Sequence, residues 1–407
     1  MIKKESVIAP FLKKHGFHLF LILYFSIHAI WAFFGGPYFP NDDSKYHIDA
    51  IQGIFEKGYP AGKLAWEGQS HECGYYAHPP LYAYLAAFPA IFLGRAFGAR
   101  ILSCTASTFA MILLRRLGDR YYPGSGIFAA ILYGMNPVMF FYTSTAQFEP
   151  TVCFFGVLAM YLASNGDEPS RMLAAVAVGC AFLTKETGVF FLFPILIRCF
   201  LDNNDWKLAV KSSLKVIIIT GIFAAIFPIL AWFTCWKAFE MQFLFHFDRA
   251  RWPLFSFVFF IINNALVIAP ILFCDLKAFK KDKDLSIGLI GGFGLFYIFL
   301  TRKYHTIALP LTVPLAILAG KGVQNKIRQP QYLFLGFGFT VLFAYFLGYY
   351  TVSMADFCCL YNKYGYTLQE CVFGYIYLSL FALSFWVIVN CIRIMLNSLK
   401  AEPNKSN

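Results

Sequence analysis

Charged side chains are scarce in this sequence, and their scarcity excludes an ordinary water-soluble protein. Only 14% of the 407 residues are Asp, Glu, Lys or Arg, whereas 59% are hydrophobic and 19% are aromatic. The mean hydropathy of +0.59 is too high for a soluble domain of this size. The composition therefore predicts a polytopic membrane protein.

Cysteine pairs with CxxC spacing are also absent, which argues against a zinc or dithiol motif. The 11 cysteines are an odd number and fall mostly in apolar runs, so they do not form a disulfide framework. At most one outer-loop bridge is left, from Cys358 or Cys359 to Cys371. No internal repeat or low-complexity tract is visible, which weakens an interpretation as a transporter built from inverted repeats.

Long apolar segments dominate what is present. A helix needs about 20 apolar residues to cross a bilayer core. Twelve segments approach this requirement: 17–35, 100–117, 124–143, 149–164, 171–184, 187–200, 212–234, 254–274, 285–301, 306–320, 331–352 and 372–395. We interpret a shorter stretch, 81–94, as an interfacial helix, because a crossing there would move Arg115, Arg116 and Arg120 to the outer side, against the positive-inside bias.

The predicted fold is an all-α bundle of about 12 transmembrane helices, between about 11 and 13, with both termini in the cytoplasm. In this arrangement the inner segments hold 22 Lys and Arg against 10 acids, and the outer segments hold 12 of each. The net charge of +12 is thus an orientation signal, and no nucleic-acid partner is needed. Residues 1–400 are expected to form one transmembrane domain with a long first outer loop, 36–99. Residues 401–407 would be a polar tail, with no separate soluble domain.

An acid pair, Asp42 and Asp43, opens this first outer loop. Apolar residues at helical spacing follow it and predict a short amphipathic helix that ends at Gly58, with Asp42 placed to cap it. Two carboxylates just beyond a membrane span can equally act as a general base, as metal ligands or as partners of a cationic intermediate. The residues alone leave these roles open.

Two further polar positions are expected on the same side of the membrane. His78 precedes two prolines at the start of the 81–94 helix, where a helix N-terminus can bind phosphate, although an incidental surface histidine fits equally well. Glu149 lies beside Pro150 at the outer rim, between two predicted spans. A helix-start carboxylate is the plain interpretation of Glu149; its side of the membrane, shared with Asp42, favours a second catalytic or metal-orienting acid.

Outer cations form the last group. Lys185 and Glu186 lie between two short spans, where a mutual ion pair is the ordinary explanation. Two later outer loops are rich in basic residues, with Arg249 in one and the run from Arg302 to His305 in the other. The phosphate of a lipid carrier would satisfy such cations, since Arg suits bidentate capture and Lys a point contact. Snorkelling to lipid headgroups is the competing account.

Five segments carry a resemblance to a known family. They are DDSKY, HPPLYAYL, NPVMFFYTSTAQFEP, AFLTKETGVFFLFP and RKYHTIALPLTVPLAILAG, spread in this order over residues 40–320. Their order resembles the GT-C glycosyltransferases, in the branch of the protein O-mannosyltransferases and the lipid A aminoarabinose transferase. The resemblance implies transfer of a hexosyl or pentosyl group from a polyprenyl-phosphate donor to a lipid, glycan or protein acceptor on the extracytoplasmic face.

The resemblance also implies roles for particular residues. Asp42 would be the main catalytic acid or base, with Asp43 and Glu149 in support. The family's D-E-x-R-Y reads DDSKY here, and His78 stands where many relatives have the Lys of K-P-P-L. The residues expected to bind substrate are Lys45, Tyr46, His78, Lys185, Arg249, Arg302, Lys303, Tyr304 and His305. The aromatic residues Trp66, Tyr75 and Tyr76 would flank the sugar or simply belong to the interfacial belt.

The sequence leaves more than one possibility open for the cofactor, the membrane and the mechanism. No cofactor is certain, and Asp42 and Glu149 would be the ligands if a divalent metal takes part. The expected location is a bacterial inner membrane, with the endoplasmic reticulum as the topologically equivalent alternative. A transporter or flippase for a phosphorylated lipid would use the same outer cations, but it should expose polar groups at mid-membrane and on both faces. A non-catalytic assembly subunit would leave Asp42 free to vary.

Overall fold

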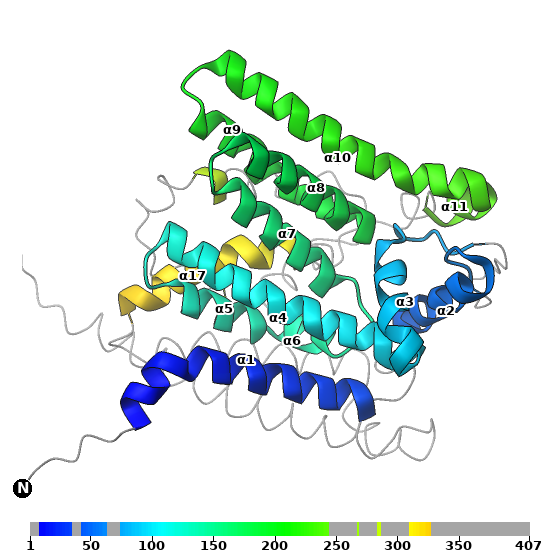
Figure 1. Ribbon diagram of the computed structural model, residues 1–407, viewed down its shortest axis with the longest axis horizontal. Coiled ribbons are helices and arrows are strands. Elements are labelled where there is room, and N and C mark those ends of the chain that lie inside the picture. The colour runs from blue at the N-terminus through cyan, green and yellow to red at the C-terminus, as the bar shows by residue number, and fades with distance from the viewer. Residues whose placement is uncertain are drawn as a thin grey trace, which may run out of the picture.

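The computed structural model describes residues 8–34, 42–62, 74–243, 267, 283–285 and 309–326, and their regular elements are all helices. Figure 1 shows these helices. They are α1 (Ile8–Phe34), α2 (Asp42–Lys57), α3 (Leu81–Leu93), α4 (Arg95–Tyr121), α5 (Gly126–Gly134), α6 (Pro137–Thr143), α7 (Glu149–Ala163), α8 (Glu168–Thr184), the 3-10 helix η1 (Glu186–Phe191), α9 (Leu192–Asp202), α10 (Trp206–Thr234), α11 (Trp236–Phe243) and α17 (Thr312–Lys326). The all-α prediction is confirmed for this part of the chain.

Three of these helices are long and apolar enough to cross a bilayer: His15–Phe34 within α1, Arg95–Tyr121 and Trp206–Thr234. Exposed apolar side chains on α10 include Ile218, Ile222 and Phe233, the last of them 81% exposed. Such a surface would be unfavourable in water and is the natural contact for lipid. The predicted spans at 254–274, 285–301, 331–352 and 372–395 lie outside the described residues, apart from Val267 and Leu285, as does the polar tail.

Two predicted spans are broken into shorter helices. The segment 124–143 forms α5 and α6, because Pro137 has no backbone N–H with which to continue α5 and instead starts the next helix. The segment 187–200 begins as η1, which runs back directly alongside α8. Gly188 allows this close approach, since a Cβ there would come within 2.2 Å of the Ala181 carbonyl carbon. These breaks depend on local backbone contacts that hydropathy does not report.

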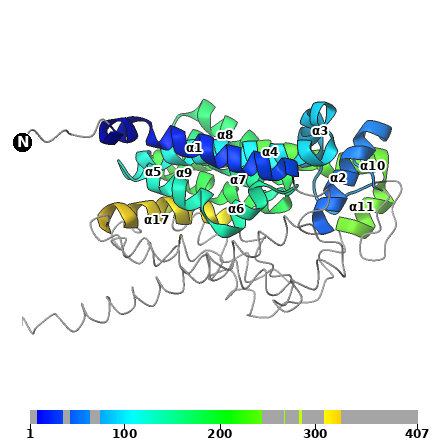
Figure 2. The ribbon, with the colours of Figure 1, turned by 90° about the horizontal axis from the view of Figure 1, so that it is seen from below.

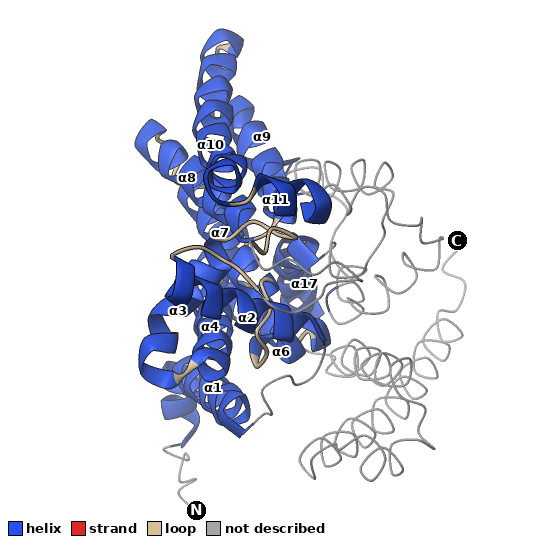
Figure 3. Cartoon of the chain, turned by 90° about the vertical axis from the view of Figure 1, so that its right-hand side faces the viewer, coloured by secondary structure: helices blue, strands red, loops and turns tan. Residues whose placement is uncertain are grey.

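The short helix expected at 81–94 is present as α3, separate from α4; its location at the membrane interface stays a prediction. The chain turns between them at Gly94, whose φ of +79° lies in the left-handed region that favours glycine. The helix α2 ends in the same way at Gly58, with φ of +78°, as predicted. In Figures 1 and 2, α2, α3 and α11 gather at one end of the bundle, and Figure 3 views the molecule from that end. We call it the outer end, in keeping with the predicted orientation.

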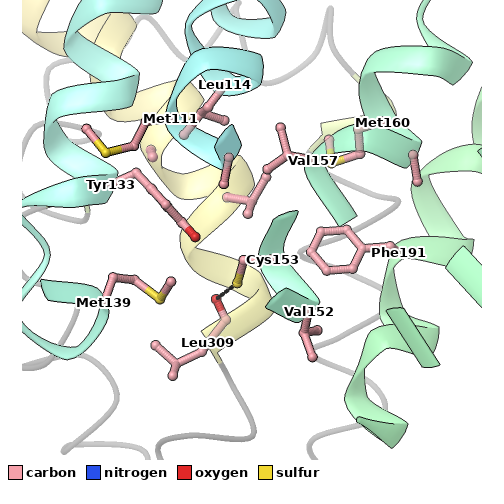
Figure 4. Close-up of a cluster of buried hydrophobic side chains, with 14 of the residues drawn as sticks. Met111, Leu114, Tyr133, Met139, Val152, Cys153, Val157, Met160, Phe191 and Leu309 are labelled. Carbon is pink, nitrogen blue, oxygen red and sulfur yellow. Dashed lines mark hydrogen bonds between the residues drawn. The ribbon is translucent and has the colours of Figure 1, made fainter. Parts of the chain in front are cut away.

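A buried apolar core joins the helices between the two ends (Figure 4). Met111 of α4, Tyr133 of α5, Val157 of α7 and Phe191 of η1 are each fully buried there. Gly156 of α7 lies beneath the Phe191 ring, and a Cβ at this position would come within 2.1 Å of it. Small residues thus let the helices approach closely, as is usual for helix packing in membranes.

The inner end is held by charged side chains from four segments. Six of them form a row of alternating sign, which we call the inner charge chain: Lys215, Glu168, Arg171, Asp202, Arg198 and Asp284. The contacts along this row measure 2.7, 3.6, 3.9, 3.2 and 3.6 Å. Its three bases and three acids balance one another. The inner charge chain therefore ties α8, α9, α10 and residue 284 together.

Candidate active site

Glu149 is the buried acid of the outer end. It begins α7 and is followed by Pro150, which suits the first turn of a helix, and its side chain is only 4% exposed. The carboxylate atom Oε1 lies 2.7 Å from Nζ of Lys185. The other oxygen, Oε2, is buried and has no hydrogen-bond partner among the described residues. The helix N-terminus and Lys185 stabilise the negative charge, yet one oxygen is left to accept a further hydrogen bond.

Lys185 reaches Glu149 because the chain is extended between α8 and η1. Its backbone has φ −158° and ψ 142°, and its side chain is 8% exposed. The expectation that Lys185 pairs with Glu186 is wrong, because consecutive residues project in different directions and each finds a partner elsewhere. Lys185 pairs with Glu149, 36 positions earlier in the chain, whereas Glu186 pairs with His78.

His78 lies beside this first pair. Its Nδ1 atom is 3.0 Å from Oε2 of Glu186, and the two side chains are 17% and 32% exposed. The following prolines lead into α3, which starts at Leu81 as expected. His78 therefore contacts an acid at the outer end of the bundle.

Phe148 links the polar groups of the site. Its ring centroid lies 3.8 Å from that of His47, 4.9 Å from that of His78 and 5.9 Å from the Lys185 ammonium. These groups thus converge from α2, from the loop before α3, from the start of α7 and from the end of α8. We call His47, His78, Glu149, Lys185 and Glu186 the outer cluster.

His47 is a member of the outer cluster that the sequence analysis did not assign. It is 2% exposed on α2, and burial is the main cause that lowers its pKa to about 3, with the charges of His78 and Lys185 acting in the same direction. The neutral ring is therefore the form present near neutral pH. A signal existed, since Ser44, His47, Ile48 and Ile51 follow helical i, i+3, i+4, i+7 spacing and are all buried.

The acid pair begins the same helix. Asp42 and Asp43 are the first two residues of α2, so Asp42 is its first helical residue and stands where the sequence predicted the helix to start. Asp43 lies one helical turn, about 6 Å of rise, before His47. The backbone thus brings the start of α2 to the outer cluster, while the two aspartate side chains are outside the described part.

Of the other predicted residues near the site, Lys45 and Tyr46 are half-buried, whereas Tyr76 is fully buried. Tyr46 is half-buried and stacks on Tyr75 with ring centroids 6.4 Å apart, and Lys45 is half-buried on the same helix. Tyr76 is fully buried, donates or accepts a hydrogen bond with Thr234 and packs on Phe227. Tyr76 is therefore a core residue between the loop and α10, and its proposed contact with a sugar was wrong.

The chain is similar to a known protein family and to solved structures. Residues 77–232 match the family described as dolichyl-phosphate-mannose-protein mannosyltransferase. The crystal structure of ArnT from Cupriavidus metallidurans bound to undecaprenyl phosphate is similar with a TM-score of 0.58 and 14% identity, over 91% of this chain and 77% of that chain. The chain has the GT-C glycosyltransferase fold. The apo structure of the same ArnT is similar over the same shares, with a TM-score of 0.55 and 14% identity. Among curated protein sequences, none matches.

The remaining predicted residues fall outside the described part. They are Trp66, Arg249, Arg302, Lys303, Tyr304 and His305, together with the cysteines Cys358, Cys359 and Cys371. One cysteine was overlooked: Cys235, at the outer end of α10, is disulfide-bonded to a partner beyond the described residues. Its position right after a predicted span was the available signal.

Metal ligands were left open by the sequence. Within the described side chains, no group of three His, Cys, Asp or Glu residues could hold an ion. The oxygen best suited to a cation there is Oε2 of Glu149, which is buried and has no hydrogen-bond partner in the described part. A cation at this position would need further ligands.

Proposed function

We propose that this chain is an integral-membrane glycosyltransferase that moves a sugar from a polyprenyl-phosphate donor to an acceptor on the extracytoplasmic face. The observation that carries this proposal is Glu149, a buried carboxylate held by Lys185 through one oxygen and lacking a described hydrogen-bond partner at the other. A buried polar atom without a partner is costly, and a bound substrate is one way to supply the missing hydrogen bond.

The donor class is supported by the similar proteins. ArnT was crystallised with undecaprenyl phosphate, and the matching family is described by dolichyl-phosphate-mannose. Both carriers are polyprenyl phosphates, so a membrane-embedded lipid phosphate is the chemistry they share. The outer cluster lies at the end of apolar helices, where a carrier of this kind would present its phosphate group.

In the proposed reaction, a hydroxyl oxygen of the acceptor forms a bond to the anomeric carbon of the sugar. The bond from that carbon to the phosphate oxygen breaks, and the polyprenyl phosphate leaves with the electron pair. Asp42 takes the proton of the hydroxyl, with Asp43 beside it, and Glu149 accepts a hydrogen bond from the acceptor or stabilises the cationic sugar centre. Lys185 fixes the direction of the Glu149 carboxylate.

The departing phosphate needs positive charge that is not already neutralised. Lys185 is matched by Glu149 at 2.7 Å, so its proposed role moves from phosphate contact to support of the carboxylate. Arg249, Arg302, Lys303, Tyr304 and His305 stay proposed phosphate ligands. His78 already has Glu186 as a partner at 3.0 Å, so we propose for it a substrate contact through the ring nitrogen that does not face Glu186. Lys45 and Tyr46 complete the proposed substrate contacts from α2. Cations at the leaving group act most strongly in the transition state, where its charge grows.

If a divalent cation takes part, Asp42 and Glu149 would hold it. Bound there, it would supply Lewis-acid stabilisation of the phosphate oxygens. Transfer by purified enzyme after chelation, followed by addition of Mg²⁺ or Mn²⁺, distinguishes the two mechanisms. Activity that is lost and then restored supports a metal, whereas full activity in chelator supports proton transfer by the carboxylates alone.

The central test removes charge from the two acids. Asp42→Asn and Glu149→Gln should each lower transfer from a polyprenyl-phosphate sugar by about 100-fold or more, with normal membrane insertion. Glu240→Gln is the matched control, because Glu240 is an exposed acid of α11 at the same end. Full activity in both variants would remove the catalytic assignment. Movement of the lipid across liposomes without a glycosidic product would instead support the flippase alternative.

The identities of sugar and acceptor belong to the same proposal. The sugar would be a hexose or a pentose, and the acceptor a lipid, a glycan or a protein. We place the reaction at a bacterial inner membrane, with the endoplasmic reticulum as the equivalent alternative. Mass spectrometry of glycolipids and glycoproteins from cells with and without the gene would identify the product and therefore the acceptor.

A further inference from the structure

The short turn between α6 and α7, residues 144–148, sets the position of Glu149. Three elements hold this turn through hydrogen bonds. Nδ1 of His28 in α1 lies 2.5 Å from Oγ of Ser144, and Oγ of Ser103 in α4 donates to the carbonyl of Gln147 at 2.9 Å. His47 in α2 binds the carbonyl of Ala146, with Nδ1 at 2.5 Å. The turn is thus anchored along most of its length.

The bond from His47 also determines its tautomer. A carbonyl oxygen can only accept, so the proton of the neutral imidazole must lie on Nδ1, which leaves Nε2 as the acceptor nitrogen. The ring face packs on Phe148, the residue immediately before Glu149, with centroids 3.8 Å apart. His47 therefore holds the turn through two contacts: a hydrogen bond to the Ala146 carbonyl and ring packing on Phe148.

The same histidine belongs to the helix that begins with the acid pair. Its bond to Ala146 joins α2 to the segment that leads into α7, so the two elements that bear carboxylates are linked by one side chain. Resting on the proposed function, we infer that His47 is a positioning residue that holds Glu149 in register with the start of α2. Neither a family role nor the sequence motifs assign this task to position 47.

Three substitutions distinguish positioning from the other roles that a buried histidine can have. His47→Asn places an amide N–H close to the position of Nδ1 and keeps the bond to Ala146. His47→Gln places its amide near the position of Nε2 and loses that bond, and His47→Phe keeps the packing but has neither nitrogen. We expect kcat to fall by about 10- to 100-fold in the Gln and Phe variants, with little change in KM for the donor, and the Asn variant to retain most of the turnover.

Hydrogen exchange of the amides in residues 143–148 gives a readout that does not depend on activity. Exchange should become faster in the Gln and Phe variants and stay near the wild-type rate in the Asn variant. Thr220→Val is the matched control, because it removes another bond from a buried side chain to a carbonyl, that of Ala175 at 3.3 Å, away from the site. It should change neither turnover nor exchange in the turn.

Each outcome decides between the interpretations. Wild-type turnover in the Phe variant, or loss in the Asn variant with retention in the Gln variant, would overturn the inference, the latter because Nε2 would then be the active atom. If the His47 variants do not fold, Ser103→Ala loosens the same turn from α4 and must lower kcat in the same way. A wild-type enzyme without transferase activity but with the expected exchange pattern would contradict the proposed function and leave the positioning role in place.

Discussion

The two ends of the bundle use the same kinds of side chain in different ways. At the inner end, charges from α8, α9, α10 and residue 284 form a row in which each one contacts an opposite charge. At the outer end, Glu149 contacts one cation and keeps an oxygen without a described hydrogen-bond partner. The inner row also contains buried atoms without a hydrogen-bond partner in the described part, among them Oδ2 of Asp202 and Oδ1 of Asp284. Its three bases and three acids nevertheless balance one another, whereas in the proposed function a bound substrate would complete the outer cluster.

This difference separates structural charge from functional charge. Removing ions from water costs several kcal/mol each, and a buried pair repays this only with good geometry and further hydrogen bonds. The row of six alternating charges supplies an opposite charge for every member, at contacts of 2.7 to 3.9 Å. Glu149 instead combines one close contact, 2.7 Å to Lys185, with a position beside His47 and His78 at the outer end, and we interpret this combination as a site for chemistry. The comparison therefore predicts opposite responses of activity and stability at the two ends.

The largest effect is expected from breaking the pair of Glu149 and Lys185. Lys185→Met leaves a buried carboxylate without its cation, so the free energy of unfolding should fall by about 3–5 kcal/mol, and transfer should fall at least 100-fold. The double variant Glu149→Leu with Lys185→Met should recover most of the stability without recovering transfer. Thermal unfolding in detergent and a donor-turnover assay measure the two quantities. Recovery of transfer in the double variant would show that the pair is merely structural.

The second prediction concerns the inner charge chain. Arg171→Met removes the cation between Glu168 and Asp202, and the free energy of unfolding should fall by about 3 kcal/mol because two acids lose a partner. Turnover per folded molecule should be unchanged, since the inner end lies across the membrane from the proposed chemistry. The measurement combines thermal unfolding with kcat corrected for the folded fraction. A tenfold drop in corrected kcat would break the distinction between the two ends.

The sequence predicted the helices better than it predicted the ion pairs at the two ends. The apolar lengths predicted α1, α4 and α10, and the acid pair and Gly58 predicted the start and end of α2, because these features are local in the chain. The partners of Lys185 and Glu186 could not be predicted, since they lie 36 and 108 positions away and depend on how the helices pack. The inner charge chain brings together residues 168–284 and was missed for the same reason.

His47 shows an intermediate case. Its burial followed from helical spacing, but its bond to Ala146 required the turn before α7 to be placed in three dimensions. The break of the 124–143 span was also visible in principle, because Pro137 cannot continue a helix that begins twelve or so residues earlier without losing a hydrogen bond. Hydropathy alone treats such a segment as continuous.

The third prediction is a pH dependence of stability that arises from buried His47 at the outer end. Burial lowers its pKa from 6.5 to about 3, so below pH 6.5 the unfolded chain binds a proton that the folded protein excludes. Stability should therefore decrease as the pH falls from about 6.5 towards 3, by about 1.4 kcal/mol at pH 5.5 for this group alone. Thermal unfolding of the wild type at pH 7.5 and 5.5 should show a larger decrease than that of His47→Asn, which has no group to titrate there. Equal decreases would mean that His47 is not kept neutral by the fold.

The smallest effect is expected at the exposed end of the inner charge chain. Lys215 contacts Glu168 at 2.7 Å, but the two side chains are 47% and 39% exposed, so water already solvates both charges. Lys215→Met should change the free energy of unfolding by about 0.5 kcal/mol or less, and less still at high salt, because exposed pairs are weakened by solvent and ions. Thermal unfolding at low and high salt measures this. A loss as large as that of Arg171→Met would mean that the row acts as a single unit whose outermost member is as important as its buried centre.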